Sequence, residues 1–425
     1  MKSLSKDDQT MYFAQIPILS LVKKYQTPLF LYDQDAIEER IHSLKEISKL
    51  NDHLTIYYAS KAFLTLAMAH IIKENNLFID VASRGELFIA LKGGIDPTHV
   101  LFHGNNKTIP DIIYAIEQGV RKFVVDNLQE LQFLKGYTNE KRITLEILIR
   151  VIPKIQDIKT HKNITTGHHQ SKFGIDLDHW LDVMISILSE AKYVSFMGFH
   201  FHIGSQLMTN AYHLKAIDYV FKYIKILKDT HHIDVKELNL GGGFGIKYTE
   251  DDHPMTIQDF MEPIIKKIQS ISNDMNLIHP HLSIEPGRYI VGGTALILYT
   301  VGIIKEGMPY PLVAINGGMT ENLRVALYQA KYQAILIDRN ENPCETYTIV
   351  GQACESTDLM IEKAHLPKLI AGDTIAFLNA GAYEHSLANN FNKTLKPAVV
   401  MIDKGKDRLI QEREVIEDLI KRDHV

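Results

Sequence analysis

Groups that can carry chemistry follow short apolar segments at several points of the sequence. The motif YASKAF at residues 58–63 places Lys61 among small and aromatic neighbours, which can lower the pKa of its amine and leave it nucleophilic. Such a lysine could bond covalently to a carbonyl carbon. A lysine after a strand is more often an ordinary surface residue, so this motif alone leaves both interpretations open.

The motif LNLGGGFG at residues 238–245 is rich in glycine. Backbone N–H groups of Gly241, Gly242 and Gly243 could approach a phosphate closely, because no side chains intervene. A glycine run can equally be a flexible turn. It is not a Walker loop, because no Gly-Lys-Ser/Thr follows it.

The motif FHFHIGSQ at residues 199–206 carries two histidines, which strand alternation would place on one face. Zinc binding by His200 and His202 is one interpretation, but no third ligand is evident in the sequence, and we expect no metal. Alternatively, a flat imidazole could stack on an aromatic cofactor ring while Ser205 reaches a phosphate oxygen.

The motif EPGR at residues 285–288 offers a carboxylate and a guanidinium in a turn. A carboxylate facing a pyridine nitrogen keeps that nitrogen protonated, and a protonated ring can accept the electron pair of a carbanion. The simpler interpretation is a local ion pair between Glu285 and Arg288.

The elements that must position these groups alternate between short apolar runs and helical patterns, such as residues 64–73 and 109–117. This rhythm is typical of parallel strands joined by helices, and about eight strands close a (β/α)8 barrel. The candidate strands are Thr55–Ala59, Leu77–Val81, Val100–His103, Lys122–Val125, Leu145–Val151, Val194–His202, Glu237–Leu240 and His281–Glu285. We therefore predict an α/β fold with a TIM-like barrel over residues 36–284, and a site at the C-terminal ends of its strands.

After Pro286 the sequence changes to strand-like runs separated by turn residues. These runs are Ala295–Ile304, Ala334–Asp338, Thr346–Val350, Thr374–Leu378 and Ala398–Ile402. They predict a C-terminal β-rich domain, sandwich-like or barrel-like, formed by residues 285–425 with residues 1–35. Periodicity does not decide whether the strand-like Pro28–Tyr32 pairs with this domain, and residues 409–423 predict a surface helix.

Composition narrows the class of protein. The chain has 425 residues and a net charge of −5, with no basic excess that would attract nucleic acid or an anionic membrane. Cys344 and Cys354 are too few for a disulfide framework. The apolar N-terminal stretch is short and broken by Pro17, so we expect a cytoplasmic protein.

Taken together, the motifs resemble the diaminopimelate decarboxylase family in order and spacing. The resemblance spans roughly residues 27–400 and is specific for the fold type shared with alanine racemase and the ornithine and arginine decarboxylases. The motifs that carry it are YASKAF, HGNNK (103–107), SKFG (171–174), HIGSQ (202–206), LNLGGGFG, EPGR, ALYQA (326–330), CES (354–356) and GAY (381–383).

The resemblance implies a barrel that binds pyridoxal 5'-phosphate through Lys61. His202 would lie against the ring, Glu285 would contact the pyridine nitrogen, and Asp80 would support the lysine side of the site. Ser205 and Gly241–Gly243 would surround the phosphate. Further residues expected near the cofactor are Gly287, Arg288 and Tyr383.

The resemblance also implies the reaction, which converts meso-2,6-diaminopimelate to L-lysine and CO2. Arg288, Arg324 and Tyr328 would hold the substrate carboxylate, with Tyr383 close by. Glu355 would hold the distal ammonium, and Cys354 would donate the proton that ends the reaction. In such enzymes Cys354 and Glu355 come from the second subunit of a homodimer.

Several positions depart from the family pattern. The usual Asn-Pro-Gly-Val-Glu-Ala run is missing at Val151–Asp157, Arg84 replaces a small residue or Glu, Thr357 replaces Gly, and Val325 replaces Pro. Glu384-His385 stands where Gly or His followed by Tyr is usual.

These departures leave the cofactor residues intact and loosen the substrate assignment. The alternatives are a decarboxylase of the same fold that acts on another diamino acid or a carboxylated polyamine, and a catalytically silent relative that binds the cofactor. A racemase fits less well, because racemases of this fold need no CES motif here.

Overall fold

The computed structural model describes residues 1–7, 10–50, 54–155 and 171–425, so the sequence departures at Gln156 and Asp157 lie outside the described residues. The chain forms two compact units. The barrel unit comprises His42–Gly245 and Pro254–Gly287, and the β unit comprises Met1–Ile41, Ile246–His253 and Arg288–Val425.

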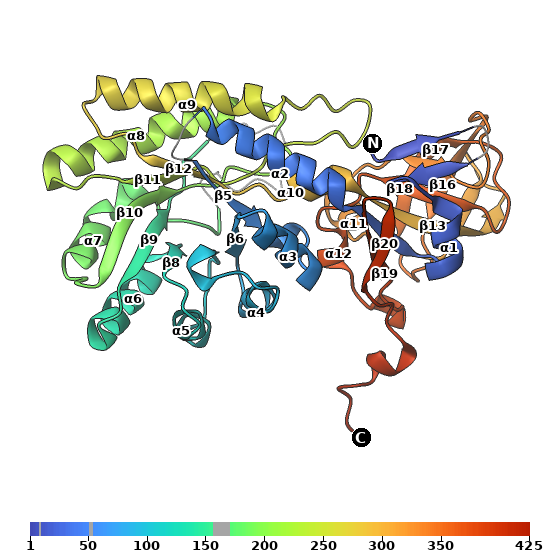
Figure 1. Cartoon of the computed structure of the whole chain (residues 1–425), viewed down its shortest axis with the longest axis horizontal. Helices are drawn as coiled ribbons and strands as arrows, with labels where there is room; N and C mark the ends of the chain where they lie inside the picture. Colours follow the sequence, from blue (N-terminus) through green and yellow to red (C-terminus); the bar gives the residue numbers. More distant parts are fainter. Residues whose placement is uncertain (8–9, 51–53, 156–170) are drawn as a thin grey trace. The chain divides into compact units, whose positions relative to one another are not determined.

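The barrel unit holds a closed barrel of parallel strands, which confirms the predicted fold class (Figure 1). In chain order the strands are β5 (Leu54–Ala59), β6 (Phe78–Val81), β7 (Val100–Phe102), β8 (Lys122–Val125), β9 (Leu145–Arg150), β10 (Val194–His200), β11 (Glu237–Asn239) and β12 (His281–Ile284). Each strand pairs with the next, and β12 pairs with β5 to close the ring. Tyr57, Leu101, Val124 and Leu148 form an apolar cluster on four of these strands.

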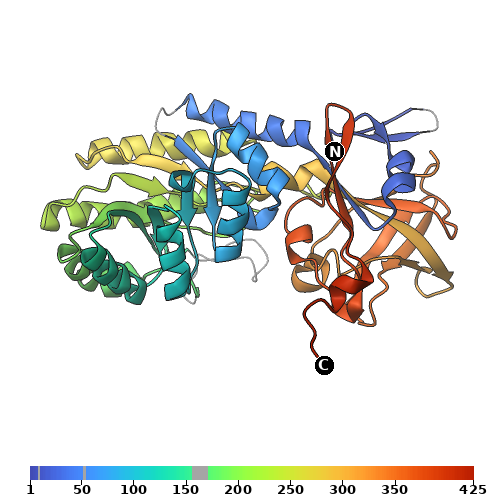
Figure 2. The same cartoon turned by 60° about the horizontal axis from the view of Figure 1, so that its bottom comes forward.

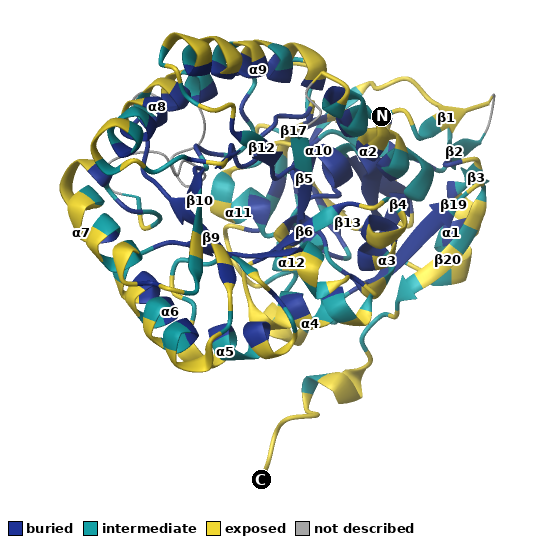
Figure 3. Ribbon diagram, turned by 60° about the vertical axis from the view of Figure 1, so that its left-hand side comes forward, coloured by how far each residue is buried: buried dark blue, intermediate teal, exposed yellow. Residues whose placement is uncertain are grey.

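Helices connect the strands, and most begin at a side chain that accepts a hydrogen bond from the first turn. Thr65, Ser83, Thr108 and Asn127 cap successive helices in this way. The helices are α2 (Gln34–Ser48), α3 (Leu66–Glu74), α4 (Arg84–Lys92), α5 (Ile109–Glu117), α6 (Leu128–Lys141), α7 (Leu177–Ser189), α8 (Ala211–His231) and α9 (Ile257–Asp274). Figure 3 shows α6 to α9 with exposed outer sides and buried inner sides, as amphipathic crossover helices require.

The β unit is built on a sheet with the strand order β17-β16-β14-β13-β4-β19-β20, and β18 joins β13 to β15. Its strands are β4 (Leu29–Asp33), β13 (Ala295–Lys305), β14 (Leu312–Ile315), β15 (Ala334–Leu336), β16 (Glu345–Val350), β17 (Leu359–Leu366), β18 (Thr374–Leu378), β19 (Ala398–Asp403) and β20 (Lys406–Gln411). Its short helices are α1 (Ile18–Tyr25), α10 (Arg288–Val291), α11 (Arg324–Tyr328) and α12 (Glu384–Leu387), and a small sheet joins β1 (Leu4–Lys6), β2 (Met11–Phe13) and β3 (Ile16–Pro17).

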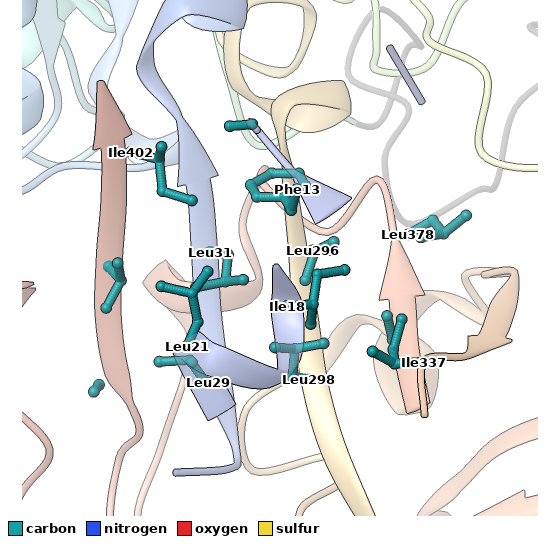
Figure 4. Close-up of a cluster of buried hydrophobic side chains, with 14 residues drawn as sticks. Phe13, Ile18, Leu21, Leu29, Leu31, Leu296, Leu298, Ile337, Leu378 and Ile402 are labelled. Atoms are coloured by element: carbon teal, nitrogen blue, oxygen red, sulfur yellow. The ribbon is translucent and has the colours of Figure 1, made fainter. Parts of the chain in front are cut away.

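The structure decides the partner of the strand-like segment near the N-terminus. The strand β4 runs antiparallel to β13 and parallel to β19, so an N-terminal strand lies inside a sheet of C-terminal strands (Figure 2). Side chains of β2, α1, β4, β13 and β19 meet in a buried apolar cluster that includes Phe13, Leu31, Leu296 and Ile402 (Figure 4).

The predicted C-terminal helix over residues 409–423 is wrong. Leu409 belongs to β20, where it pairs with Val400 of β19, and only Ile416–Leu419 form a 3-10 turn. Val415, Ile416 and Ile420 are exposed, so no core stabilises a helix here, and an isolated helix of this length is marginal. None of the helices in the described residues combines the length and apolar character that crossing a bilayer requires.

Candidate active site

Lys61 lies in a single 3-10 turn, Ser60–Ala62, directly after β5. Its side chain is exposed, whereas Ser60 and Ala62 are buried. Lys61 is close enough to Asp80 and His202 for its charge to affect the pKa of both groups. Asp80, at the end of β6, is buried, and burial raises its pKa to about 6. The structure therefore brings these three predicted residues together.

Glu285 is the centre of a buried polar network just after β12. Asn239 Nδ2 donates to Glu285 Oε1 at 2.9 Å, and His103 Nε2 lies 2.9 Å from the same oxygen. His200 Nε2 lies 3.2 Å from Glu285 Oε2. Burial alone would raise the pKa of Glu285, but His103 and His200 outweigh it and hold the pKa well below its usual range. Glu285 is therefore a carboxylate at neutral pH.

The Glu285 carboxylate has partners other than the Arg288 of its own EPGR motif. The groups that contact the Glu285 carboxylate come from β10, β11 and the loop after β7. Sequence reasoning gave no role to His103 or Asn239. The signals were present, since His103 opens the HGNNK motif and Asn239 lies two residues before the first glycine of the run.

The two histidines of FHFHIGSQ have different surroundings. The strand β10 ends at His200, so His202 lies beyond the strand and the expected alternation does not extend to it. Burial lowers the pKa of His200 to about 4 and the pKa of His202 well below its usual value, so both imidazoles are neutral. Gly242 N donates to His202 Nδ1 at 3.2 Å, which leaves the proton of neutral His202 on Nε2.

Three buried groups have ligand atoms within 4.8 Å of one another, namely those of His103, His200 and Glu285, a spacing at which such groups could hold a metal ion. This group contains His200 but not His202, so it differs from the pair of histidines that the sequence suggested. Asn239, however, already donates to the Glu285 carboxylate. The Glu285 carboxylate is therefore placed to accept a hydrogen bond from a ring N–H, and the same geometry would also suit a metal ligand.

The glycine run packs directly on neighbouring backbone. A Cβ on Gly242 would lie 2.1 Å from Glu285 O, and one on Gly243 would lie 2.3 Å from Gly204 O. Gly241 and Gly243 also have φ of +66° and +98°, which favour glycine. The N–H of Gly241 is already bonded to Asn239 Oδ1, as that of Gly242 is to His202. Close packing therefore accounts for these glycines, and phosphate binding by their N–H groups stays a prediction.

Two further predicted residues are Ser205, which lies beside the glycine loop, and Gly287, which lies beside the Lys61 turn. Ser205 directly follows Gly204 and is partly buried. A Cβ on Gly287 would lie 3.0 Å from the Cβ atoms of Ala59 and Ala62, so glycine lets the Glu285 turn approach the Lys61 turn closely. Ala59 N also donates to Pro286 O at 3.2 Å.

In the β unit, Arg288 and Arg324 belong to one buried group, which we call the arginine cluster and which also contains Tyr248, Tyr332 and Glu384. Arg288 Nη1 donates to Tyr248 Oη, and Arg324 Nη1 donates to Tyr248 Oη at 3.1 Å and to Glu384 Oε1 at 2.8 Å. Tyr332 Oη bonds both Arg324 and Glu384. Sequence reasoning missed both tyrosines and noticed Glu384 only as a departure.

Tyr383 and Tyr328 lie next to this cluster. The guanidinium of Arg288 lies 4.9 Å from the centre of the Tyr383 ring, and Tyr383 has a left-handed backbone (φ 80°) at the start of α12. Tyr328 is the last residue of α11, which begins at Arg324, and is partly buried.

The hydrogen bonds that the structure shows for Cys354 and Glu355 are made with residues outside the arginine cluster. Both are exposed in the turn between β16 and β17. Cys354 N donates to Asn392 Oδ1 at 2.6 Å, and Asp358 accepts from the backbone of Ala353 at 2.8 Å, so the turn is anchored from both sides.

The barrel residues fit pyridoxal phosphate. Lys61 offers an amine, His202 a neutral flat ring, and Glu285 a buried anion that can hold a ring N–H. A parallel barrel with these groups at its strand ends is the arrangement expected of a pyridoxal-dependent enzyme. Residues 34–292 match the family model described as "Pyridoxal-dependent decarboxylase, pyridoxal binding domain".

Comparison with relatives identifies one family within this class. The chain is 39% identical to the diaminopimelate decarboxylase of Bacillus subtilis over 96% of this chain and 94% of the relative, and 38% identical to that of Staphylococcus aureus over 96% of each. A crystal structure of diaminopimelate decarboxylase from M. jannaschii in complex with L-lysine superposes with a TM-score of 0.92 at 32% identity, covering 100% of this chain and 98% of the other. The chain belongs to the diaminopimelate decarboxylase family.

Proposed function

We propose that the chain, with pyridoxal phosphate bound in the barrel unit, removes CO2 from meso-2,6-diaminopimelate and releases L-lysine. The observation that carries the proposal is the ionised Glu285, held by Asn239, His103 and His200 inside the barrel. When bound, the cofactor supplies a protonated ring that accepts the electron pair left by departing CO2.

In the barrel unit, Lys61 would hold the cofactor covalently through its amine. Glu285 would keep the ring nitrogen protonated, and the neutral imidazole of His202 would contact the ring. Ser205 and the glycine loop would bind the phosphate, with Gly243 as the proposed N–H donor because those of Gly241 and Gly242 are engaged. Asp80, Gly287 and Tyr383 complete the surroundings of the cofactor.

In the β unit, Arg288, Arg324 and Tyr328 bind the carboxylate that is not removed, since paired guanidinium groups match a carboxylate. Glu355 binds the distal ammonium. The Cys354 thiol donates a proton to the carbon that has lost CO2.

We further propose a homodimer in which Cys354 and Glu355 complete the site of the second subunit. Their exposure on an anchored turn supports this assignment, because an exposed and fixed pair is suited to reach another chain. The two cysteines are both free, which supports a cytoplasmic location.

The test is CO2 release from meso-diaminopimelate by purified protein loaded with pyridoxal phosphate, with the product identified by mass. Lys61→Ala serves as the blank. Release of lysine by the wild type alone supports cofactor, reaction and substrate together. A yellow protein that releases nothing from this substrate contradicts the substrate assignment and favours another diamino acid or a silent relative.

A further inference from the structure

The turn between β16 and β17 carries both Cys354 and Glu355, and its position is set mainly by polar contacts. Within residues 351–358, Asp358 is the one buried residue, with 4% of its surface exposed. Most of its neighbours in the turn are exposed, so apolar packing contributes little to fixing them. The contacts of Asp358 therefore decide how firmly the turn is placed.

The Asp358 carboxylate accepts hydrogen bonds from two segments of the chain. Its Oδ2 accepts from Ala353 N at 2.8 Å, within the turn, and its Oδ1 accepts from Met319 N at 2.7 Å, in the loop between β14 and α11. Gln352 N also donates to Gly317 O at 2.9 Å, between the same two segments. One buried carboxylate thus joins the turn to the loop that precedes α11.

Two glycines make room for this carboxylate. A Cβ on Gly351 would lie 2.1 Å from Asp358 Oδ2, and one on Gly318 would lie 2.5 Å from Asp358 Oδ1. Gly351 belongs to the turn and Gly318 to the loop, so the carboxylate is enclosed between the two segments. Moving it would be costly, because two N–H groups would each lose a charged acceptor.

We propose that Asp358 is a positioning residue for the reaction, which couples the turn that carries Cys354 to the loop that leads to Arg324. The inference rests on the proposed function, in which Cys354 gives its thiol proton to the carbon that has lost CO2. The resulting thiolate then takes a proton from solvent. The donor must lie within reach of that carbon, and a misplacement of about 1 Å can lower a rate by about 100-fold.

A double-mutant cycle separates positioning of Cys354 from a general effect on the fold. Asp358→Asn keeps the size of the side chain but leaves one acceptor oxygen for two N–H donors. It should lower kcat for CO2 release by roughly 10- to 100-fold when Cys354 is present. In the Cys354→Ala background, where the donor is already absent, the same change should lower the residual kcat by less than about 3-fold.

Asp373→Asn is the matched control, because Asp373 is also 4% exposed and anchors a turn of the same unit that carries none of the proposed site residues. Its Oδ2 accepts from Ile370 N at 2.8 Å, and its Oδ1 accepts from Arg339 Nη1 at 2.6 Å. This variant should leave kcat unchanged in both backgrounds.

Hydrogen exchange of the cofactor-loaded protein, resolved to single residues by mass spectrometry, tests the coupling without using activity. In the wild type, the Ala353 amide should exchange slowly although its neighbours in the turn are exposed. Asp358→Asn should speed the exchange of both Ala353 and Met319 by roughly 10-fold or more, since a hydrogen bond to a charged group is worth about that much. The wild-type measurement stands even if the variant does not fold.

Equal fold losses of kcat in the two backgrounds would overturn the inference, since Asp358 would then only support the fold. Rapid exchange of the Ala353 amide in the wild type would overturn it as well. The proposed function is tested separately by CO2 release from meso-diaminopimelate. A wild type that releases none, with Ala353 and Met319 both protected through Asp358, would reject the proposed reaction and retain the coupling of the two segments.

Discussion

Glu285 is the single residue on which the proposed chemistry most depends. Its carboxylate stays ionised because His103 and His200 outweigh the cost of burial. Glu285→Gln should lower kcat by roughly 10²–10³-fold, the loss typical when one group that stabilises developing charge is removed. Lys61 should still hold the cofactor, so the protein should stay yellow. Steady-state kinetics and an absorbance spectrum measure both, and an unchanged kcat would contradict the role of Glu285.

Glu321 supplies a second prediction for a single residue, here for stability. Burial raises the pKa of Glu321 to about 7, although Gly318 N donates to its Oε2 at 2.7 Å. Because the pKa of Glu321 is higher in the folded protein than in the unfolded chain, the unfolded chain releases this proton at a lower pH. The free energy of unfolding therefore falls as the pH rises toward and through 7. Between pH 5.5 and 8.5 the Glu321 contribution should fall by about 2 kcal/mol.

Urea unfolding of wild type and Glu321→Gln at several pH values measures this contribution. The variant cannot ionise, so its free energy of unfolding should decrease less over the same pH range, whatever its absolute stability. Parallel pH profiles for the two proteins would show that Glu321 is not the group responsible.

The glycine loop after β11 is an element whose backbone packing leaves no room for a side chain. A Cβ on Gly242 would lie 2.1 Å from the carbonyl oxygen of Glu285. Gly242→Ala should therefore displace Glu285, lower the free energy of unfolding by roughly 3 kcal/mol or more, and weaken cofactor binding. Denaturation and titration with pyridoxal phosphate measure the two effects.

Gly136 in α6 is the matched control for this loop. A Cβ there would meet nothing within 4 Å, and the residue lies inside a helix. Gly136→Ala should raise the free energy of unfolding by about 0.5–1 kcal/mol and leave cofactor affinity unchanged. Similar effects from both substitutions would contradict the packing argument.

At the scale of the whole molecule, the proposed homodimer predicts complementation. Lys61→Ala and Cys354→Ala each remove one part of the site. If each site takes Lys61 from one chain and Cys354 from the other, a mixed dimer contains one intact site. Mixing, dissociating and reassociating the variants should therefore restore about a quarter of wild-type activity, because half of the dimers are mixed and each has one working site. Activity that stays at background would contradict a shared site.

Much of the architecture could be predicted from the sequence because its signals are local. Short apolar runs separated by helical patterns specify parallel strands and crossovers, and Lys122–Val125 and Ile109–Glu117 agree with the predicted bounds. The family pattern likewise depends on short motifs such as YASKAF and EPGR. The tail at residues 409–423 was predicted wrongly, because strand pairing with β19 outweighs its helical spacing.

The sequence by itself therefore determined the class of fold, the family and the types of side chain at the strand ends. Only the tertiary structure brought His103, Asn239 and His200 to Glu285, since closing the barrel joins strands far apart in the chain. It also placed Tyr248, from a segment within the barrel's part of the sequence, in the β unit. In the same way it paired Glu384 with Arg324. Such contacts depend on which strands and turns meet in space, and no local periodicity encodes them.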